Sequence, residues 1–153
     1  MYRRRLLPIL FLRFPTLKKG AYFSEDDIAP ETHCTIAGWG KTEFYGQSNV
    51  LRHAAVKTIS LNACNGLESK MYRELTGEFS FCAGVIGGGA DSCTGDSGGP
   101  LYCRNGGEEV LVGITSKGNG CGKAGRPGIY SNVSKVISWI QEHTQGKGAP
   151  QNN

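Results

Sequence analysis

The sequence predicts an all-β globular chain built from short strands and tight turns. Glycine is unusually common, with 23 of the 153 residues, and charged residues make up only 20%. Turn signals containing Gly or Pro recur along the chain, which favours an all-β fold over a helical bundle. The hydrophobic fraction of 39% is enough for a modest core, so we expect one domain of ordinary size.

Several short segments have the composition of β-strands. Residues His33 to Gly40 alternate between polar and apolar side chains, and Val50 to Ile59 is a second extended stretch with β-branched residues. Further strand candidates lie between turns at Phe79 to Ala83, Leu101 to Arg104, Glu109 to Ser116 and Gly128 to Val133. The pattern is therefore a series of short strands connected by Gly-rich turns.

Two segments have helical features instead. Ser60 can cap a short helix that runs through Cys64 to about Leu75, where Gly77 would stop it. A second, amphipathic helix is expected from about residue 134 to residue 144, with its apolar stripe docked on the β core. The apolar positions at helical spacing are Val133, Val136, Ile137 and Ile140.

The two ends of the chain show no clear pattern. Residues 1–30 have no steady period, so we assign them no structure. Arg3 to Arg5 and the apolar run Leu6 to Leu12 have the order of a secretory signal, but the run is short, Arg13 interrupts it and no cleavage site follows. The run is also too short to span a membrane. Residues 146–153 are expected to form a disordered tail.

The charged residues argue against two kinds of partner. The net charge is +4, but beyond the basic leader the Lys and Arg residues are scattered among acidic ones. Nucleic-acid and membrane surfaces are bound by clustered positive charge. We therefore expect neither partner and interpret the charges as an ordinary solvated surface.

The six cysteines predict disulfide bonds. Their number is even, and no pair has the close spacing expected of a zinc site. They are Cys34, Cys64, Cys82, Cys93, Cys103 and Cys121. We expect disulfides formed in an oxidising compartment, with no metal site and no cofactor. Many pairings of six cysteines are possible, so the connectivity stays open at this point.

The strongest signal for chemistry is the string Gly95-Asp96-Ser97-Gly98-Gly99-Pro100, in a loop between two expected strands. A nucleophilic serine must be exposed on a tight turn that aims backbone N–H groups at the oxygen of a tetrahedral intermediate. Glycines on both sides of the serine permit that geometry. A surface turn with an incidental serine would not need these neighbours, so the motif predicts a nucleophile at position 97.

Over residues 31–145 the chain resembles the chymotrypsin family of serine proteases, in its trypsin-like branch. Cys34 to Gly40 is similar to the first strand of that family's second β-barrel. Later landmarks match in order at Phe81 to Gly84, Pro127 to Tyr130, and Trp139 with Ile140. The resemblance implies a six-stranded antiparallel Greek-key barrel with a C-terminal α-helix packed on it, and an N-terminal barrel that is missing.

The resemblance also implies chemical roles. Ser97 would be the nucleophile, the N–H groups of Gly95 and Ser97 would form the oxyanion hole, and Asp96 would pair with a new α-amino group on activation. The implied disulfides all lie inside this half of the family's fold, and they are Cys34 to Cys103, Cys64 to Cys82, and Cys93 to Cys121.

A specificity pocket for basic side chains is implied as well. Asp91 stands six residues before Ser97, where the trypsin-like branch has the carboxylate at the base of its pocket. Such a carboxylate would pair with a substrate Lys or Arg. Pocket walls are expected at Ser116, Gly118 and Gly128. Lys117 departs from the family, which usually has Trp there, and it puts a positive charge at the entrance of a pocket for positive charges.

The residues that activate the family's serine are not recognisable. The family uses a His that a buried Asp orients, both from its N-terminal barrel. His33 resembles that His only because Cys34 follows it, and the segment that begins at Asp27 resembles the surroundings of that Asp only by coincidence. His53, on a strand, and His143, near the end of the last helix, are expected to have surface or packing roles.

No Ile/Val-x-Gly-Gly start follows a Lys or Arg in this sequence. Asp96 would then lack its amine partner, and the loop around Ser97 would resemble that of an inactive precursor.

Two functions from different classes follow from these observations. In the first, the chain belongs to a secreted serine endopeptidase that cleaves after Lys or Arg, and it is a truncated half, inactive by itself. Its partners would be polypeptide substrates, protein protease inhibitors and the missing N-terminal barrel. In the alternative, the chain is a non-catalytic binding module with a protease-like fold.

Overall fold

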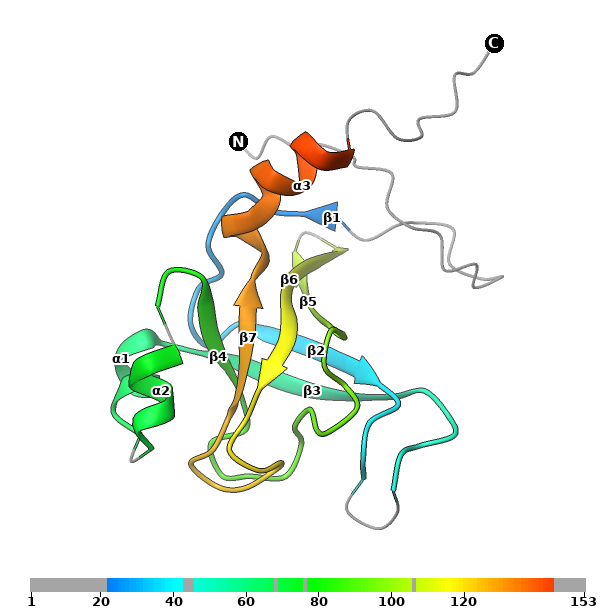
Figure 1. Ribbon diagram of the computed structural model, residues 1–153, viewed down its shortest axis with the longest axis vertical. Helices are drawn as coiled ribbons and strands as arrows, with labels where there is room; N and C mark the ends of the chain where they lie inside the picture. Colours follow the sequence, from blue (N-terminus) through cyan, green and yellow to red (C-terminus); the bar gives the residue numbers. More distant parts are fainter. Residues whose placement is uncertain (1–21, 43–45, 68, 76, 106, 145–153) are drawn as a thin grey trace.

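Six antiparallel strands close into one β-barrel, with the order β2-β3-β4-β7-β6-β5 and a final pairing of β5 with β2 (Figure 1). This computed structural model describes residues 22–42, 46–67, 69–75, 77–105 and 107–144. The barrel and its C-terminal helix confirm the predicted fold class. The leader with its apolar run and the tail at residues 146–153 lie outside the described residues.

The strand bounds agree with the sequence pattern to within a few residues. The strands are β1 (Tyr22–Phe23), β2 (His33–Gly38), β3 (Arg52–Ile59), β4 (Ser80–Gly84), β5 (Pro100–Asn105), β6 (Glu108–Lys117) and β7 (Gly128–Asn132). The helices are α1 (Leu61–Asn65), α2 (Lys70–Leu75), the 3₁₀ helix η1 (Val133–Val136) and α3 (Ile137–Thr144).

The inside of the barrel is filled by alternate residues of its strands. In β5, for example, Leu101 and Cys103 are buried, while Arg104 and Asn105 are exposed. The main cluster of buried side chains consists of Cys34, Ile36, Val56, Ala83, Leu101, Cys103, Val110, Val112 and Tyr130. Burial of this apolar surface supplies the main favourable term in folding.

The helix predicted to run to about Leu75 is wrong as one element, because the structure divides it into α1 and α2. Ser60 does cap α1, since its Oγ accepts a hydrogen bond of 3.2 Å from the N–H of Ala63. Asn65 and Gly66 then form a weak point, because both have low helix propensity. In α2, buried Tyr72 donates its hydroxyl to the carbonyl of Pro127 at 3.1 Å. This tertiary contact fixes the direction of the second helix.

The C-terminal helix begins as a 3₁₀ turn. Asn132 caps η1, since its Oδ1 accepts a hydrogen bond of 3.1 Å from the N–H of Ser134. Of the predicted docking face, Val133 and Ile137 are buried and Ile140 is half-buried, but Val136 is exposed. α3 lies at the end of the barrel where β7 finishes, away from the connection between β6 and β7 (Figure 1).

The segment before Glu31 packs on the barrel, although the sequence shows no periodicity there. β1 runs parallel to β6, with Tyr22 opposite Val110. Ile28 packs against the main core cluster. The described residues 22–30 therefore pack on the barrel, although the sequence pattern predicted no structure for them.

The three disulfides implied by the family resemblance are present, and they join Cys34 to Cys103, Cys64 to Cys82, and Cys93 to Cys121. The first connects β2 to β5 inside the barrel, and the second connects α1 to β4. The third joins the loop before Ser97 to the connection between β6 and β7. These covalent links restrict the loops that carry the candidate site.

Candidate active site

Ser97 lies exposed in the second of two consecutive tight turns. The N–H of Asp96 donates to the carbonyl of Cys93 at 2.9 Å, and the N–H of Gly99 donates to the carbonyl of Asp96 at 2.8 Å. The flanking glycines have φ angles that favour glycine, 99° at Gly95 and 81° at Gly98. The motif thus has the local geometry that the sequence predicted for an exposed serine.

The rest of the barrel holds this turn in place. The N–H of Gly98 donates to the carbonyl of Thr115, and the N–H of Thr115 donates to the carbonyl of Gly99, both at 2.9 Å. Within the described part of the chain, no protein group accepts a hydrogen bond from the N–H of Gly95 or Ser97. Both N–H groups are therefore without an acceptor among these residues.

Asp96 points away from solvent toward β2 and the segment after it. Its Oδ1 accepts a hydrogen bond of 2.7 Å from the N–H of Gly40, and its Oδ2 accepts one of 2.9 Å from the N–H of Cys93. A side-chain carbon at Gly40 would stand 2.5 Å from the carboxyl carbon of Asp96, so only glycine fits there. Two backbone N–H groups thus hold the Asp96 carboxylate against β2 and the segment after it.

The backbone N–H of Gly122 holds one oxygen of the Asp91 carboxylate. Its Oδ2 accepts a hydrogen bond of 2.9 Å from the N–H of Gly122, while its Oδ1 is buried and has no hydrogen-bond partner. Burial raises the pKa of the Asp91 carboxyl group, and the N–H of Gly122 opposes that shift. An added side-chain carbon at Gly128 would stand 3.1 Å from Oδ1, so a glycine keeps the space beside this oxygen open.

Neighbouring hydroxyl groups support the Asp91 side of the site. The hydroxyl groups of Ser92 and Tyr130 are 3.0 Å apart and share a hydrogen bond. Burial raises the pKa of Tyr130 to about 12, so its hydroxyl stays protonated at neutral pH. Sequence reasoning missed this pair, since the two residues are 38 positions apart and nothing in the sequence links Ser92 to the landmark that ends at Tyr130.

The other predicted pocket walls lie at the end of β6. Ser116 and Lys117 are its last residues, and both are exposed. Gly118 follows, and an added side-chain carbon there would stand 3.2 Å from the carbonyl oxygen of Gly120. The side chain of Lys117 is therefore exposed to solvent at the end of β6.

A cavity of about 550 Å³ lies beside Asp91 and Asp96. The half-buried part of its lining includes both carboxylates together with Gly38 of β2. Its exposed lining includes Lys41 and Arg52. Acidic groups thus lie inside and basic groups at the outer edge.

None of the three histidines donates to or accepts from Ser97. His33 begins β2 and lies five residues, or roughly 17 Å along an extended strand, from Gly38 beside the site. His53 is exposed on β3 and lines the cavity. The ring of His143 stacks on Trp139 in α3, with Nδ1 2.8 Å from the Trp139 carbonyl oxygen.

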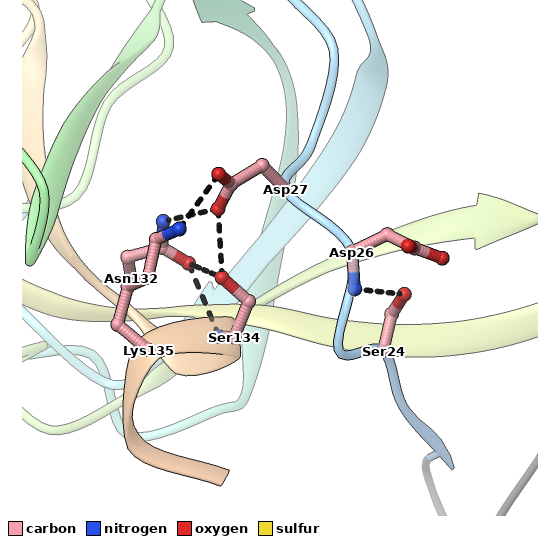
Figure 2. Close-up of polar contacts among 6 residues, drawn as sticks. All are labelled: Ser24, Asp26, Asp27, Asn132, Ser134 and Lys135. Atoms are coloured by element: carbon pink, nitrogen blue, oxygen red, sulfur yellow. Dashed lines mark hydrogen bonds and ion pairs between the residues drawn. The ribbon is translucent and has the colours of Figure 1, made fainter.

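Asp27 takes part in a structural cluster. Figure 2 shows its carboxylate facing Asn132, Ser134 and Lys135. It accepts hydrogen bonds from Ser134 Oγ at 2.8 Å and from Asn132 Nδ2 at 3.1 Å, and Lys135 Nζ is 2.8 Å away. The carboxylate fastens the N-terminal segment to η1, which agrees with the interpretation that its likeness to a catalytic Asp is a coincidence.

Within the same described ranges, no group of three or more His, Cys, Asp or Glu side chains could hold a metal ion. Likewise, no helix in the described residues is long and apolar enough to cross a membrane.

Comparison with known proteins agrees with the geometry. The family model described as "Trypsin" matches residues 14–140. Serine protease 56 of Mus musculus is 44% identical over 115 residues, which is 72% of this chain and 18% of that relative. The chain therefore spans about a fifth of the length of this relative. The match over most of the barrel shows that the chain belongs to the trypsin family of serine proteases.

Proposed function

We propose that the chain carries the nucleophile and the specificity pocket of a serine endopeptidase that cleaves after Lys or Arg. The observation that carries this proposal is the buried Oδ1 of Asp91, which has no hydrogen-bond partner. A buried acceptor without a partner costs free energy, and a substrate guanidinium or ammonium group would satisfy it. Asp91 also lines the cavity of about 550 Å³, from which such a group could approach it.

Ser97 is the proposed nucleophile. Its hydroxyl oxygen would attack the carbonyl carbon of the scissile bond, and the resulting oxyanion would accept hydrogen bonds from the N–H groups of Gly95 and Ser97. These are the two donors that no described acceptor occupies. Exposure of the serine on its turn gives a substrate access to it.

Asp96 is the proposed activation carboxylate. It lines the cavity described above, where an α-amino group could reach it. A positive charge there would neutralise a half-buried carboxylate and hold the turn around Ser97 in place. Glycines at positions 38 and 40 leave the space that the carboxylate occupies.

By itself the chain is proposed to be inactive. The step at Ser97 requires a base that removes the hydroxyl proton, and none of the three histidines is bonded to this serine. The base and its orienting carboxylate would come from an N-terminal barrel. Because the three disulfides lie in a trypsin-family domain, we propose that the protein is secreted and acts on polypeptides or binds protein inhibitors.

A cationic probe tests the pocket independently of catalysis. Titration of the chain with p-aminobenzamidine, whose fluorescence rises in a protein pocket, should show saturable binding that Asp91→Asn abolishes. Asp26→Asn is the control, because Asp26 is exposed and lies outside the cavity. Equal binding by wild type and Asp91→Asn would overturn the assignment of the pocket. A chain that binds peptides without any dependence on Asp91 would instead behave as the non-catalytic binding module.

A further inference from the structure

The cavity beside Asp96 is lined by a negatively charged group on the inside and by positively charged groups at its outer edge. Asp96 lies half-buried in it, whereas Arg52 and Lys41 line it as exposed residues. In the described part of the chain, neither basic side chain forms an ion pair with a carboxylate. Arg52 Nε donates to Ser48 Oγ at 3.1 Å, which holds the side chain without neutralising it.

Arg52 lies close to Asp96 across the barrel wall. It is directly opposite Gly38 in the ladder between β2 and β3, so the two Cα atoms are about 5 Å apart. Gly38 in turn contacts the Asp96 carboxylate. An extended peptide advances about 3.3 Å per residue, so a chain that starts at Asp96 passes Arg52 within its first few residues.

β3 also offers an edge along which such a peptide could leave the cavity. On one side β3 pairs with β2 from Arg52 to Lys57. On the other side it pairs with β4 only from Lys57 to Ile59. Among the described strands, residues 52–56 therefore have no partner on that edge, and an unpaired edge can accept an added strand.

We propose that the cavity selects an extended peptide with a free amino terminus and an acidic side chain within its first five residues. The amino group faces Asp96, and the acidic side chain pairs with Arg52, with Lys41 adding positive charge nearby. This inference rests on the proposed function, which supplies the pairing of an amino group with Asp96. It adds the requirement for an acidic residue and the role of Arg52 as a specificity-determining residue.

Titration of the full chain with peptides separates the pairing of the amino group with Asp96 from the pairing of the acidic side chain with Arg52. Five-residue amidated peptides beginning with Ile-Val would carry Glu, Gln or Lys at position three, four or five. Binding would be followed by the NMR amide signals of Gly40 and Cys93, whose N–H groups donate to Asp96. At low ionic strength, at least one Glu position should bind about threefold to fivefold more tightly than its Gln counterpart, and salt should remove the difference.

Substitutions test which residue causes the preference for Glu peptides over Gln peptides. Arg52→Gln should abolish it, Arg52→Glu should reverse it in favour of the Lys peptides, and Lys57→Gln should leave it unchanged. Lys57 is the matched control, because it is an exposed cation on the same strand that does not line the cavity.

Two different failures are distinguishable. If free-amine peptides bind through Asp96 but Glu and Gln peptides bind equally, the role of Arg52 is wrong and the pairing at Asp96 stands. If acetylated and free-amine peptides behave alike, or no peptide shifts the two amide signals, the pairing at Asp96 is itself wrong, and the requirement for an acidic residue fails with it.

Discussion

The Oδ1 atom of Asp96 accepts a hydrogen bond of 2.7 Å from the backbone N–H of Gly40, 56 residues earlier in the chain. This bond connects the loop that carries Ser97 to the segment after β2. It requires glycine at its donor end, because any side chain at position 40 would occupy the place of the carboxylate. Contact with the Asp96 side chain therefore explains why glycine stands at positions 38 and 40.

Gly40→Ala should destabilise the protein. The added methyl group would meet the Asp96 carboxyl group at 2.5 Å, so the carboxylate must leave its two backbone donors. Overpacking of this kind costs about 1–3 kcal/mol. Urea denaturation would measure the loss. Gly87→Ala is the matched control, since nothing lies within 4 Å of the added carbon there, and an equal loss in both variants would refute the steric account.

Asp91→Asn should stabilise the protein at neutral pH. Burial raises the pKa of Asp91 in the folded state above that in the unfolded chain, so the native protein binds more protons over the interval between the two values. Wild-type stability therefore falls as the pH rises through that interval. The asparagine has no charge to desolvate. At pH values above the folded-state pKa of Asp91, the free energy of unfolding of Asp91→Asn should exceed that of wild type by about 1 kcal/mol. Below about pH 4, where Asp91 is protonated in both states, the two proteins should be equally stable.

Thermal unfolding of wild type and Asp91→Asn across pH 3–8 would measure this difference. The low-pH samples serve as an internal control for other effects of the substitution. An advantage of the asparagine that is the same at every pH would contradict the assignment to a buried charge.

Asp27→Asn should destabilise the protein slightly, and only above the acid range. Hydrogen bonds from Lys135 and Ser134 lower the pKa of the Asp27 carboxyl group in the folded state. The stabilisation by the ionised Asp27 carboxylate is therefore complete above about pH 4, the pKa of Asp in the unfolded chain. It is lost as the pH falls through the lower pKa of Asp27 in the folded protein. The side chain is 59% exposed, so the loss should stay below about 1 kcal/mol. The control in chemical denaturation is the neighbouring variant Asp26→Asn, because the Asp26 side chain is exposed and makes no contact with the cluster (Figure 2), and an equal loss in both variants would refute this role of Asp27.

Asn132 should be glycosylated poorly if the protein is secreted. Asn132-Val133-Ser134 is an N-glycosylation sequence, but Asn132 Nδ2, the atom that would carry the sugar, donates to Asp27 at 3.1 Å. Ser134 Oγ donates to the same carboxylate. Mass spectrometry of secreted protein should show low occupancy, and Asp27→Ala should raise it. Full occupancy in the wild type would show that this cluster does not protect the asparagine.

The strands and the nucleophile loop could be predicted because their signals are local. Alternation marked β2, and the glycines around Ser97 marked a turn that needs unusual φ angles. The break between α1 and α2 had a local signal in the low helix propensity of Asn65 and Gly66, which the prediction of one helix did not use. The direction of α2 was missed because the contact of Tyr72 with Pro127, 55 residues away, fixes it. The packing of Asp27 on η1 was missed for the same reason, since its partners follow 105 or more residues later.

The central proposal is that this chain carries the nucleophile Ser97 and its pocket but is inactive by itself, because none of its three histidines contacts this serine. A cleavage assay tests it most directly. Residues 1–153, folded under oxidising conditions, would be assayed on short amide substrates that end in Arg, with Ser97→Ala as the control. We predict no enzyme-like turnover, because loss of the histidine alone leaves at most about 10³ to 10⁴-fold acceleration over water. Cleavage by the wild type at rates typical of a trypsin-family enzyme, abolished in Ser97→Ala, would contradict the account and show that a base is present.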